Sequence, residues 1–327
     1  MKSRAVALFA LAVALVLAAP GSDALAGKAD SAAPSHLTIA YQPGLGAAPL
    51  ILVKQLHLIE HRYPATTVSW KVLGSGSLVT DGVISGQLDL GTVGIPPLLI
   101  GWARGVNWRV LASLDLVDLW LMATDPAIKT IADLKGKRIA TPTNISIMAV
   151  VLRRMAELRL GDPHALDGGL VAMDGPDAMQ ALLSGQIDAH FASPPFQFQE
   201  KLRGAHVVAR SYQYFGAHSG QMVVAQQSFY DSHPALARWL YGQVQAMEQL
   251  IARNPTKAAH VLQDDAGGSP TWRQFKQWLA SPALTWTTRP LGLMRFASFM
   301  FRTQQLTRKP GSWLDLVFPP AQQEQGS

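Results

Sequence analysis

The amino-acid sequence predicts an α/β fold made of two lobes. Alternating apolar strands are followed by segments of helical spacing, first from residue 36 and again from residue 138. Such alternation predicts mixed, mostly parallel sheets covered by helices. A phrase also occurs twice, as SGQLDLGTVGIPP from Ser85 and as SGQIDAHFASPP from Ser184. Each copy is expected to join a short helix to a strand, so we interpret it as one structural joint used in each lobe.

The first lobe is expected to begin with a strand at residues 36–41, which glycines at 44 and 46 end. A helix is predicted over residues 47–60, because apolar residues recur there at helical spacing, and Pro64 closes it. The predicted elements that follow are a strand at 67–73, a Gly-Ser-Gly-Ser turn at 74–77, a helix at 78–85, a strand at 88–93 and a helix opening at Ile95.

The second lobe repeats this order. Its predicted elements are a strand at 138–140, a helix at 146–159, a strand at 170–173, a helix at 176–183 and a strand at 189–191. Segments 119–123 and 222–225 are expected to cross between the lobes as a two-strand hinge. Helices are predicted at 233–254, 272–279 and 293–306. The expected lobes are therefore residues 36–122 plus 225–327, and residues 123–224.

The first 26 residues are organised like a signal peptide. Lys2 and Arg4 precede an apolar run at residues 5–18, and Ala24-Leu25-Ala26 fits a cleavage site. The run is about 14 residues, shorter than the roughly 20 that span a bilayer, although an uncleaved anchor is the alternative. We expect cleavage near Ala26, a flexible leader at 27–35 and a periplasmic location without membrane insertion.

Composition excludes several classes of function. The chain contains no cysteine, which excludes disulfides, thiol nucleophiles and a lipid anchor on cysteine. The net charge is +6, but the basic residues are scattered, so no nucleic-acid partner is expected and a mild preference for anionic solutes is. Neither G-x-S-x-G nor S-x-x-K occurs and no Ser/His/Asp set is recognisable, so we expect no enzyme and no cofactor.

One motif points to metal. His57-Leu58-Ile59-Glu60-His61 matches the H-x-x-E-H pattern of zinc peptidases, and on a helix both histidines would share a face. The alternative is a polar, solvated helix end just before Pro64. We favour that alternative and assign no metal ligand.

The chain resembles the solute-binding proteins of ABC importers for nitrate, taurine and alkanesulfonates, and the thiamine-precursor binders of similar build. The resemblance covers roughly residues 36–265. It is carried by the order of IAYQPGLGAAPLILVKQLHLIEHRYP, GSGS, SGQLDLGTVGIPP, IKTIADLKGKRIATPTNIS, SGQIDAHFASPP and SHPALARWL. It implies a type II periplasmic-binding-protein clamshell, a monomer that delivers a small solute to an ABC permease and its ATPase subunits.

The resemblance also implies a set of ligand-binding positions. Family ligands lie between the lobes, at strand ends and helix starts, which agrees with the general behaviour of open α/β sheets. The matching residues are Tyr41, Gln42, Ser75, Gly76, Ser77, Gly94, Ile95, Asn144, Ser146 and Ser193. We add Phe191, although strand parity leaves open whether Phe191 or His190 faces the cleft. Ser77, Ser146 and Ser193 are also expected to cap helices.

Two departures from the family pattern bear on the ligand. The family often has a carboxylate where this chain has Ala192-Ser193-Pro194, and its loss removes a partner for a ligand amine. The proline pairs at 96–97 and 194–195 remove backbone donors from two helix starts. The Gly-Ser-Gly-Ser turn at 74–77 and the turn Asn144-Ile145-Ser146 are the better anion sites. With serine hydroxyls and backbone N–H groups as donors, we expect a small organic anion resembling an aliphatic sulfonate. The alternatives are a neutral or aromatic heterocycle such as a pyrimidine, an exported enzyme, or a sensor component.

Overall fold

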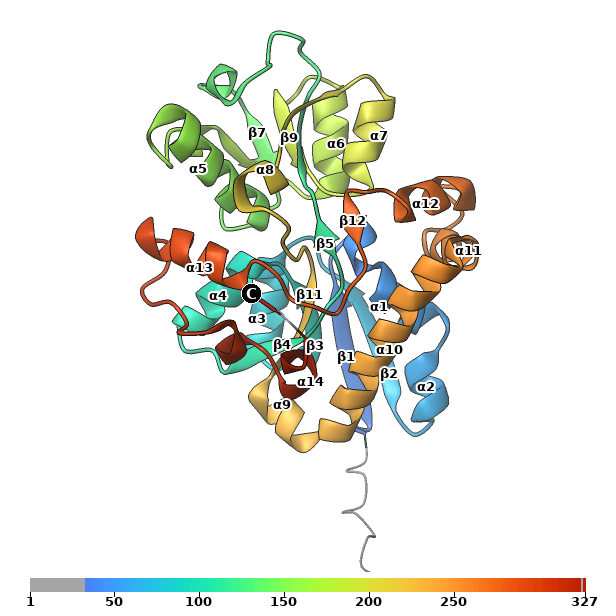
Figure 1. The fold of residues 1–327 in the computed structure, drawn as a ribbon. Coiled ribbons are helices and arrows are strands. Elements are labelled where there is room, and N and C mark those ends of the chain that lie inside the picture. Colours follow the sequence, from blue (N-terminus) through green and yellow to red (C-terminus); the bar gives the residue numbers. More distant parts are fainter. Residues whose placement is uncertain (1–32, 325) are drawn as a thin grey trace, which may run out of the picture.

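The computed structural model describes residues 33–324 and 326–327, which form two lobes, one above the other in Figure 1. The expected signal peptide and residues 27–32 of the expected leader lie outside the described residues. In the described part of the chain, no helix combines the length and apolar character needed to cross a membrane.

The first lobe is built on a five-stranded sheet of order β2-β1-β3-β11-β4. Its strands are β1 (His36–Tyr41), β2 (Thr67–Val72), β3 (Leu90–Val93), β4 (Trp108–Ser113) and β11 (Met222–Gln226). Strand β1 pairs in parallel with β2 and β3, whereas β11 is antiparallel to β3 and β4. Because only β11 opposes the others, the sheet is mixed but mostly parallel, as predicted.

The second lobe has the same arrangement, in a sheet of order β10-β6-β9-β7-β8. Its strands are β6 (Trp120–Ala123), β7 (Ile139–Thr141), β8 (Leu170–Ala172), β9 (Ala189–Ala192) and β10 (His206–Arg210). Here β6 is the strand that opposes the rest. In each lobe, the opposed strand is therefore the one that has just crossed from the other lobe.

The chain crosses between the sheets through residues 114–119 and 216–221. The two crossings are hydrogen-bonded to each other, since Leu114 N donates to Gln221 O (2.9 Å) and Val117 N donates to His218 O (3.1 Å). A third segment joins them, because β5 (Leu116–Val117) pairs with β12 (Leu284–Thr285) from the C-terminal part (Figure 1). The predicted hinge thus gains a strand that the sequence did not indicate.

The expected lobe boundaries at 122 and 224 fall inside strands. Strand β6 belongs wholly to the second sheet, and β11 belongs wholly to the first. We therefore propose that the lobes divide within the crossing segments, a few residues earlier than expected in both cases.

Helices cover both sheets. In the first lobe they are α1 (Ala48–Gln55), α2 (Leu58–Arg62), α3 (Gly76–Ile84), α4 (Ile95–Ala103), α9 (Gln227–Ser232), α10 (Pro234–Arg253), α11 (Pro255–Asp265), α12 (Trp272–Leu279), α13 (Leu293–Arg302) and α14 (Pro319–Gln322). In the second they are α5 (Ile147–Leu160), α6 (Gly175–Leu183), α7 (Phe196–Leu202) and α8 (Tyr212–Phe215). Short 3-10 turns lie at Leu45–Ala47, Ile131–Leu134, Asp167–Gly169 and Trp313–Leu316.

The predicted helix over residues 47–60 is wrong in one respect. It is broken into α1 and α2 at His57, which has the left-handed conformation (φ 50°). By contrast, both copies of the repeated phrase behave as predicted. Gly86 and Gly185 follow α3 and α6 with φ of 74° and 76°, a conformation that favours glycine and ends a helix.

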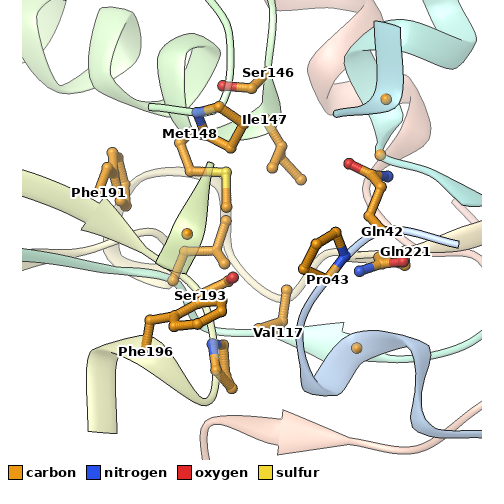
Figure 2. A pocket seen from close by; sticks show the side chains of 18 of the residues that line it. Gln42, Pro43, Val117, Ser146, Ile147, Met148, Phe191, Ser193, Phe196 and Gln221 are labelled. Atoms are coloured by element: carbon orange, nitrogen blue, oxygen red, sulfur yellow. The ribbon is translucent and has the colours of Figure 1, made fainter. Parts of the chain in front are cut away.

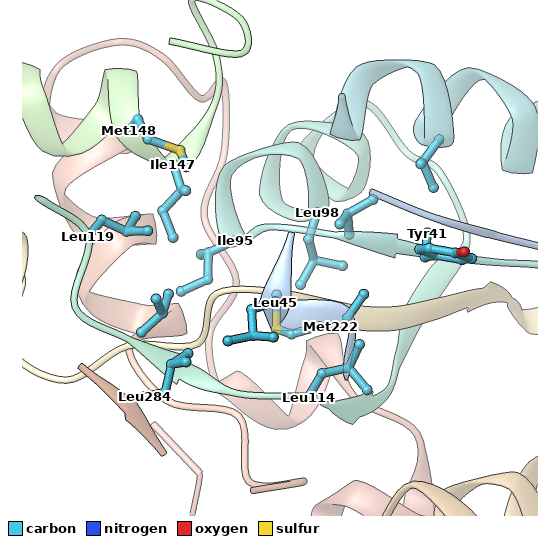
Figure 3. Close-up of a cluster of buried hydrophobic side chains, with 14 of the residues drawn as sticks. Tyr41, Leu45, Ile95, Leu98, Leu114, Leu119, Ile147, Met148, Met222 and Leu284 are labelled. Atoms are coloured by element: carbon cyan, nitrogen blue, oxygen red, sulfur yellow. The ribbon is translucent and has the colours of Figure 1, made fainter. Parts of the chain in front are cut away.

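The hydrophobic core continues from one lobe to the other near the hinge. Figure 3 shows Ile95 and Leu98 of α4 in the same cluster as Ile147 and Met148 of α5. Leu284 of β12 belongs to this cluster too. The apolar contact beside the hinge therefore brings the start of a first-lobe helix close to the start of a second-lobe helix.

Candidate functional site

A cavity of about 80 Å³ lies between the lobes, where strand ends, helix starts and the hinge meet (Figure 2). This volume is enough for several water molecules or one small solute. The first lobe contributes Gln42, Pro43, Gly46, Gly74, Gly76, Gly94 and Pro97. The second contributes Pro142, Thr143, Ser146, Ile147, Met148, Gly175, His190, Phe191, Ser193, Pro194 and Phe196. The crossing segments contribute Asp115, Val117, Leu119, Gly220 and Gln221.

Helix starts surround this cavity. The lining includes Gly76 at the start of α3, Gly94 before α4, Ser146 before α5 and Gly175 at the start of α6. Helix N-termini carry unpaired N–H groups and a partial positive charge. At α3 the approach to α4 is close, because a Cβ at Gly76 would lie 3.0 Å from Pro97 Cγ and would crowd that ring. These helix starts therefore contribute a partial positive charge to the cavity wall, and no lysine or arginine is among the lining residues.

Six residues predicted as ligand-binding line the cavity, namely Gln42, Gly76, Gly94, Ser146, Phe191 and Ser193. A hydrogen bond fixes the position of the Gln42 amide, since its Nε2 donates to Thr92 O (2.8 Å). His190 and Phe191 both line the cavity, which lies beyond the end of β9. The open question of which of the two faces the cleft is therefore answered by both residues.

Five predicted residues do not line the cavity. Tyr41 and Ile95 are core residues, and the Tyr41 hydroxyl accepts a hydrogen bond from Lys54 Nζ (3.0 Å). Asn144 lies at a separate interlobe depression beside Arg153. Ser75 and Ser77 lie at the start of α3, but only the backbone of their neighbours Gly74 and Gly76 reaches the cavity.

The capping predictions are partly corrected. Ser146 caps α5 as predicted, because its Oγ accepts from Ala149 N (3.3 Å). Ser75 rather than Ser77 caps α3, since that helix begins two residues earlier than expected and Ser75 Oγ accepts from Leu78 N (3.4 Å). Ser193 caps nothing: α7 begins at Phe196 after Pro195. The Ser193 hydroxyl has no hydrogen-bond partner among the described residues and remains available to a solute.

Two titratable groups line the cavity besides the predicted residues: His190, which the sequence left open against Phe191, and Asp115, which was not predicted. His190 Nδ1 lies 2.5 Å from Glu200 Oε1, and both side chains are buried. Asp115 is 1% exposed, and its Oδ1 accepts from Gln221 N (2.8 Å). Burial raises the pKa of Asp115 to about 7, against the opposing effect of the Gln221 and Gly220 backbone N–H groups. A carboxyl group is therefore present in the cavity, although not at the place where the family pattern has one.

Sequence reasoning missed Asp115 and Gln221 because they lie in the crossing segments, more than 100 positions apart. Their proximity depends on the pairing of the two crossings. The only local signal was that Asp115 interrupts an otherwise apolar stretch at residues 114–117. An acid in such a stretch indicates a function or a specific partner.

A serine, a histidine and an aspartate do meet in the hinge. Ser211 Oγ lies 2.9 Å from His218 Nε2 and donates to Asp118 Oδ1 (3.4 Å). The carboxylate thus contacts the serine and not the histidine, unlike the order in hydrolase triads. Ser211 and His218 are fully buried and do not line the cavity, and burial lowers the pKa of His218 to about 4. We assign this set a structural role in the hinge.

The H-x-x-E-H segment does not lie on one helix, because His57 forms the break before α2. The His57 and His61 ring centroids lie 6.4 Å apart. Among the described residues, no group of three or more histidine, aspartate or glutamate side chains is placed to hold a metal ion.

The chain is similar in sequence to known proteins. The family model described as NMT1/THI5 like matches residues 70–258. A protein of Escherichia coli (strain K12), named as an aliphatic sulfonates-binding protein, is 29% identical over 197 residues, covering 59% of this chain. The taurine-binding periplasmic protein of the same organism is 26% identical over 221 residues, or 66% of this chain. The chain spans 60% and 66% of the length of these two relatives.

Solved structures share the fold. The alkanesulfonate-binding protein from Xanthomonas axonopodis pv. citri bound to MOPS has a TM-score of 0.72 at 21% identity, covering 90% of this chain and all of that chain, 100%. The periplasmic nitrate-binding protein from Synechocystis PCC 6803 has a TM-score of 0.69 at 12% identity, covering 88% of this chain and 86% of that chain. The predicted two-lobed periplasmic-binding-protein fold is thereby confirmed.

Proposed function

The chain belongs to the NMT1/THI5-like family, and from this premise we propose that it is the periplasmic solute-binding component of an ABC importer. It captures a small organic anion between its lobes and presents the closed form to a permease and its ATPase subunits. Two relatives are named for binding aliphatic sulfonates and taurine, and a third is named as an ABC transporter periplasmic binding protein, which supports this assignment. No chemical step and no cofactor is part of it.

The observation that carries the proposal is the interlobe cavity. It is lined from both lobes and from the hinge, and four helix starts face it. The Leu45 N–H of the first lobe donates to Pro194 O of the second (2.9 Å), so the lobes touch beside the cavity. A solute that contacts both walls would favour this closed arrangement over an open one by its additional contacts.

The anion is assigned to the helix starts and to hydroxyl groups. N–H groups at helix N-termini bind anions without a cationic side chain. The Ser193 hydroxyl and the Gln42 amide add polar contacts from opposite lobes (Figure 2). Met148, Phe191 and Phe196 supply an apolar wall for a short carbon chain.

The proposal is tested by a thermal-shift screen of the purified protein, followed by calorimetry of each hit. The panel holds nitrate, sulfate, alkane- and arylsulfonates, carboxylates and pyrimidines. A solute at about 100 times its dissociation constant should stabilise the protein by about 2.7 kcal/mol, which raises the melting temperature by a few degrees. Binding confined to pyrimidines, or turnover of any bound solute, would refute the proposed function.

A matched pair of variants localises the site. Ser193→Leu places a branched side chain at the cavity wall and should weaken binding at least about tenfold, because it fills space that the solute needs. Ser184→Leu makes the same change at an exposed residue after α6, outside the cavity, and should leave the affinity unchanged. Equal affinities of the two variants would place the solute elsewhere.

A further inference from the structure

The second lobe's wall of the cavity holds a buried pair of a histidine and a carboxyl group. His190 of β9 is 2% exposed, and Glu200 of α7 is fully buried. Nδ1 of His190 lies 2.5 Å from Oε1 of Glu200, whereas Oε2 of Glu200 is buried and has no hydrogen-bond donor. Among the described residues, the imidazole is therefore the only group that is hydrogen-bonded to this carboxyl group.

The other edge of the His190 ring is open to the cavity. His190 lines the cavity, and no described residue forms a hydrogen bond with its Nε2. The described side-chain atoms that are fully enclosed without a partner include Glu200 Oε2 but not His190 Nε2. Because Nε2 is unpaired and yet not enclosed, it keeps accessible surface, and a solute in the cavity can reach it.

Few other charges act on this pair. The strands beside β9, which are β6 and β7, hold no ionisable side chain. On α7, the Nζ of Lys201 lies over the Trp120 ring, 5.6 Å from its centroid, and forms no ion pair with Glu200. On α6, Asp177 is exposed, and at the hinge Asp115 is the other titratable group in the lining. The two partners themselves therefore decide where the protons of the pair lie.

The chemistry of the pair places a hydrogen on Nε2. If the carboxyl is ionised and the imidazole is protonated, both ring nitrogens carry a hydrogen. If the carboxyl keeps the proton instead, its O–H donates to Nδ1, and the hydrogen of the neutral imidazole then lies on Nε2. Nε2 is bare only when the pair has a net negative charge, which is disfavoured for a buried carboxylate with one unsatisfied oxygen. We therefore expect an N–H donor at the cavity wall.

A donor at this position matters because the turn after β9 offers few others. Pro194 and Pro195 have no backbone N–H group, and no lysine or arginine lines the cavity. Ser193 contributes a hydroxyl to the same wall. We propose that His190, held by Glu200, determines specificity for the anionic group of the solute by donating a hydrogen bond to it from Nε2. Glu200 is then a positioning residue. This inference rests on the proposed function and deepens it.

The first test is the tautomer of His190, which can be measured without a solute. Nitrogen-15 NMR of the purified protein with labelled histidine distinguishes a ring nitrogen that carries a hydrogen from one that does not. At about pH 7, Nε2 of His190 should carry a hydrogen. Its signal should then shift when ethanesulfonate, sulfate or acetate binds. A bare Nε2 would overturn the inference.

The second test measures affinity by calorimetry. His190→Leu combined with Glu200→Met removes the pair together, so that no buried carboxylate is left without a partner. The anion that binds the wild type most tightly among ethanesulfonate, sulfate and acetate should bind this double variant at least about tenfold more weakly, because a hydrogen bond to a charged group is lost. His164→Leu removes an exposed histidine of the second lobe outside the cavity, and this matched control should leave the affinity unchanged.

The outcomes separate this inference from the proposed function. If anions bind but neither the Nε2 signal nor the affinity of the double variant changes, His190 has no part in binding and the proposed function stands. If the double variant does not fold, the response of the wild-type Nε2 signal to the bound anion decides. If no anion binds the wild type, the proposed function fails and the role of His190 fails with it.

Discussion

At the scale of single residues, Glu248 on α10 shows how a buried carboxyl makes stability depend on pH. Its side chain is 5% exposed, and Oε1 has no hydrogen-bond donor. Burial raises its pKa to about 9, and the carboxyls of Glu324 and Asp115 act in the same direction. Tyr241 donates its hydroxyl to Glu324 (2.7 Å) and not to Glu248. The folded state therefore holds a proton on Glu248 that the unfolded chain releases near its ordinary pKa of 4.5.

We expect Glu248→Gln to stabilise the protein, increasingly as pH rises from about 5 to 9. The folded state binds more protons than the unfolded state in this interval, so the wild-type contribution of Glu248 to stability falls with pH. Glutamine cannot ionise and removes that loss. Urea unfolding at pH 5, 7 and 9 measures the difference. Asp231→Asn, at an exposed carboxyl of α9, is the control. It should change the free energy of unfolding by the same amount at all three pH values.

The Glu248 prediction would be contradicted if the variant and the wild type kept a constant stability difference across these pH values. His218 acts in the opposite direction between about pH 4 and 6.5, because burial lowers its pKa from 6.5 to about 4 and the unfolded chain binds the proton first. His218 is present in both the wild type and the variant, so its contribution cancels in the stability difference, which therefore reports Glu248.

Sequence reasoning located cavity residues well where a short turn directly follows a strand. Gln42, Gly94 and Ser193 lie there, and the end of a parallel strand is a general ligand position. It failed for Tyr41 and Ile95, because one step along the chain changes a cavity residue into a core residue. Asp115 and Gln221 could not be found, since no local pattern reports that two hinge segments pair.

At the scale of elements, the break between α1 and α2 shows where the observed structure departs from what the local sequence pattern predicts. The apolar spacing over residues 47–60 fits one helix, yet His57 has φ of 50°, and Leu56 and His57 still donate to Leu52 O and Lys54 O (both 3.0 Å). The end of α1 therefore closes with a left-handed residue, a position that glycine occupies with least strain.

His57→Gly should leave the protein unchanged or stabilise it by up to about 1 kcal/mol, because glycine adopts the left-handed conformation without the Cβ clash. In a continuous helix, the same change would destabilise by about 1 kcal/mol. The sign of the effect in urea unfolding thus tests the break directly. Ala246→Gly, at an exposed interior position of α10, is the matched control and should show that loss of about 1 kcal/mol.

At the scale of the whole molecule, the sequence predicted the two lobes, their mixed sheets and both crossings. These features follow from strand and helix periodicity, which is local. The place of the C-terminal part was not predicted beyond its return to the first lobe. It supplies β12 to the hinge, and α13 packs on α4 while its Phe296 stacks on Phe215 of α8 (4.0 Å). Such contacts depend on distant side chains and leave no periodic signal.

The contacts of α13 and the segment after it also bear on lobe closure. Arg302 at the end of α13 forms an ion pair with Glu157 of α5, and Arg153 donates to Gln305 Oε1 (3.0 Å). The hydrogen bond from Arg302 lowers the pKa of Glu157. Both pairs join the first lobe to the second and would separate if the lobes opened. They favour the closed form even without solute.

Arg302→Gln should therefore weaken solute binding by up to about fivefold, because an exposed ion pair contributes up to about 1 kcal/mol and a smaller closed population lowers the apparent affinity. Small-angle scattering of the solute-free variant should show a larger radius of gyration than that of the wild type. Arg138→Gln removes an ion pair with Asp188 inside the second lobe and is the matched control. If both variants weakened binding equally, the effect would reflect charge alone and the α13 contact would have no part in closure.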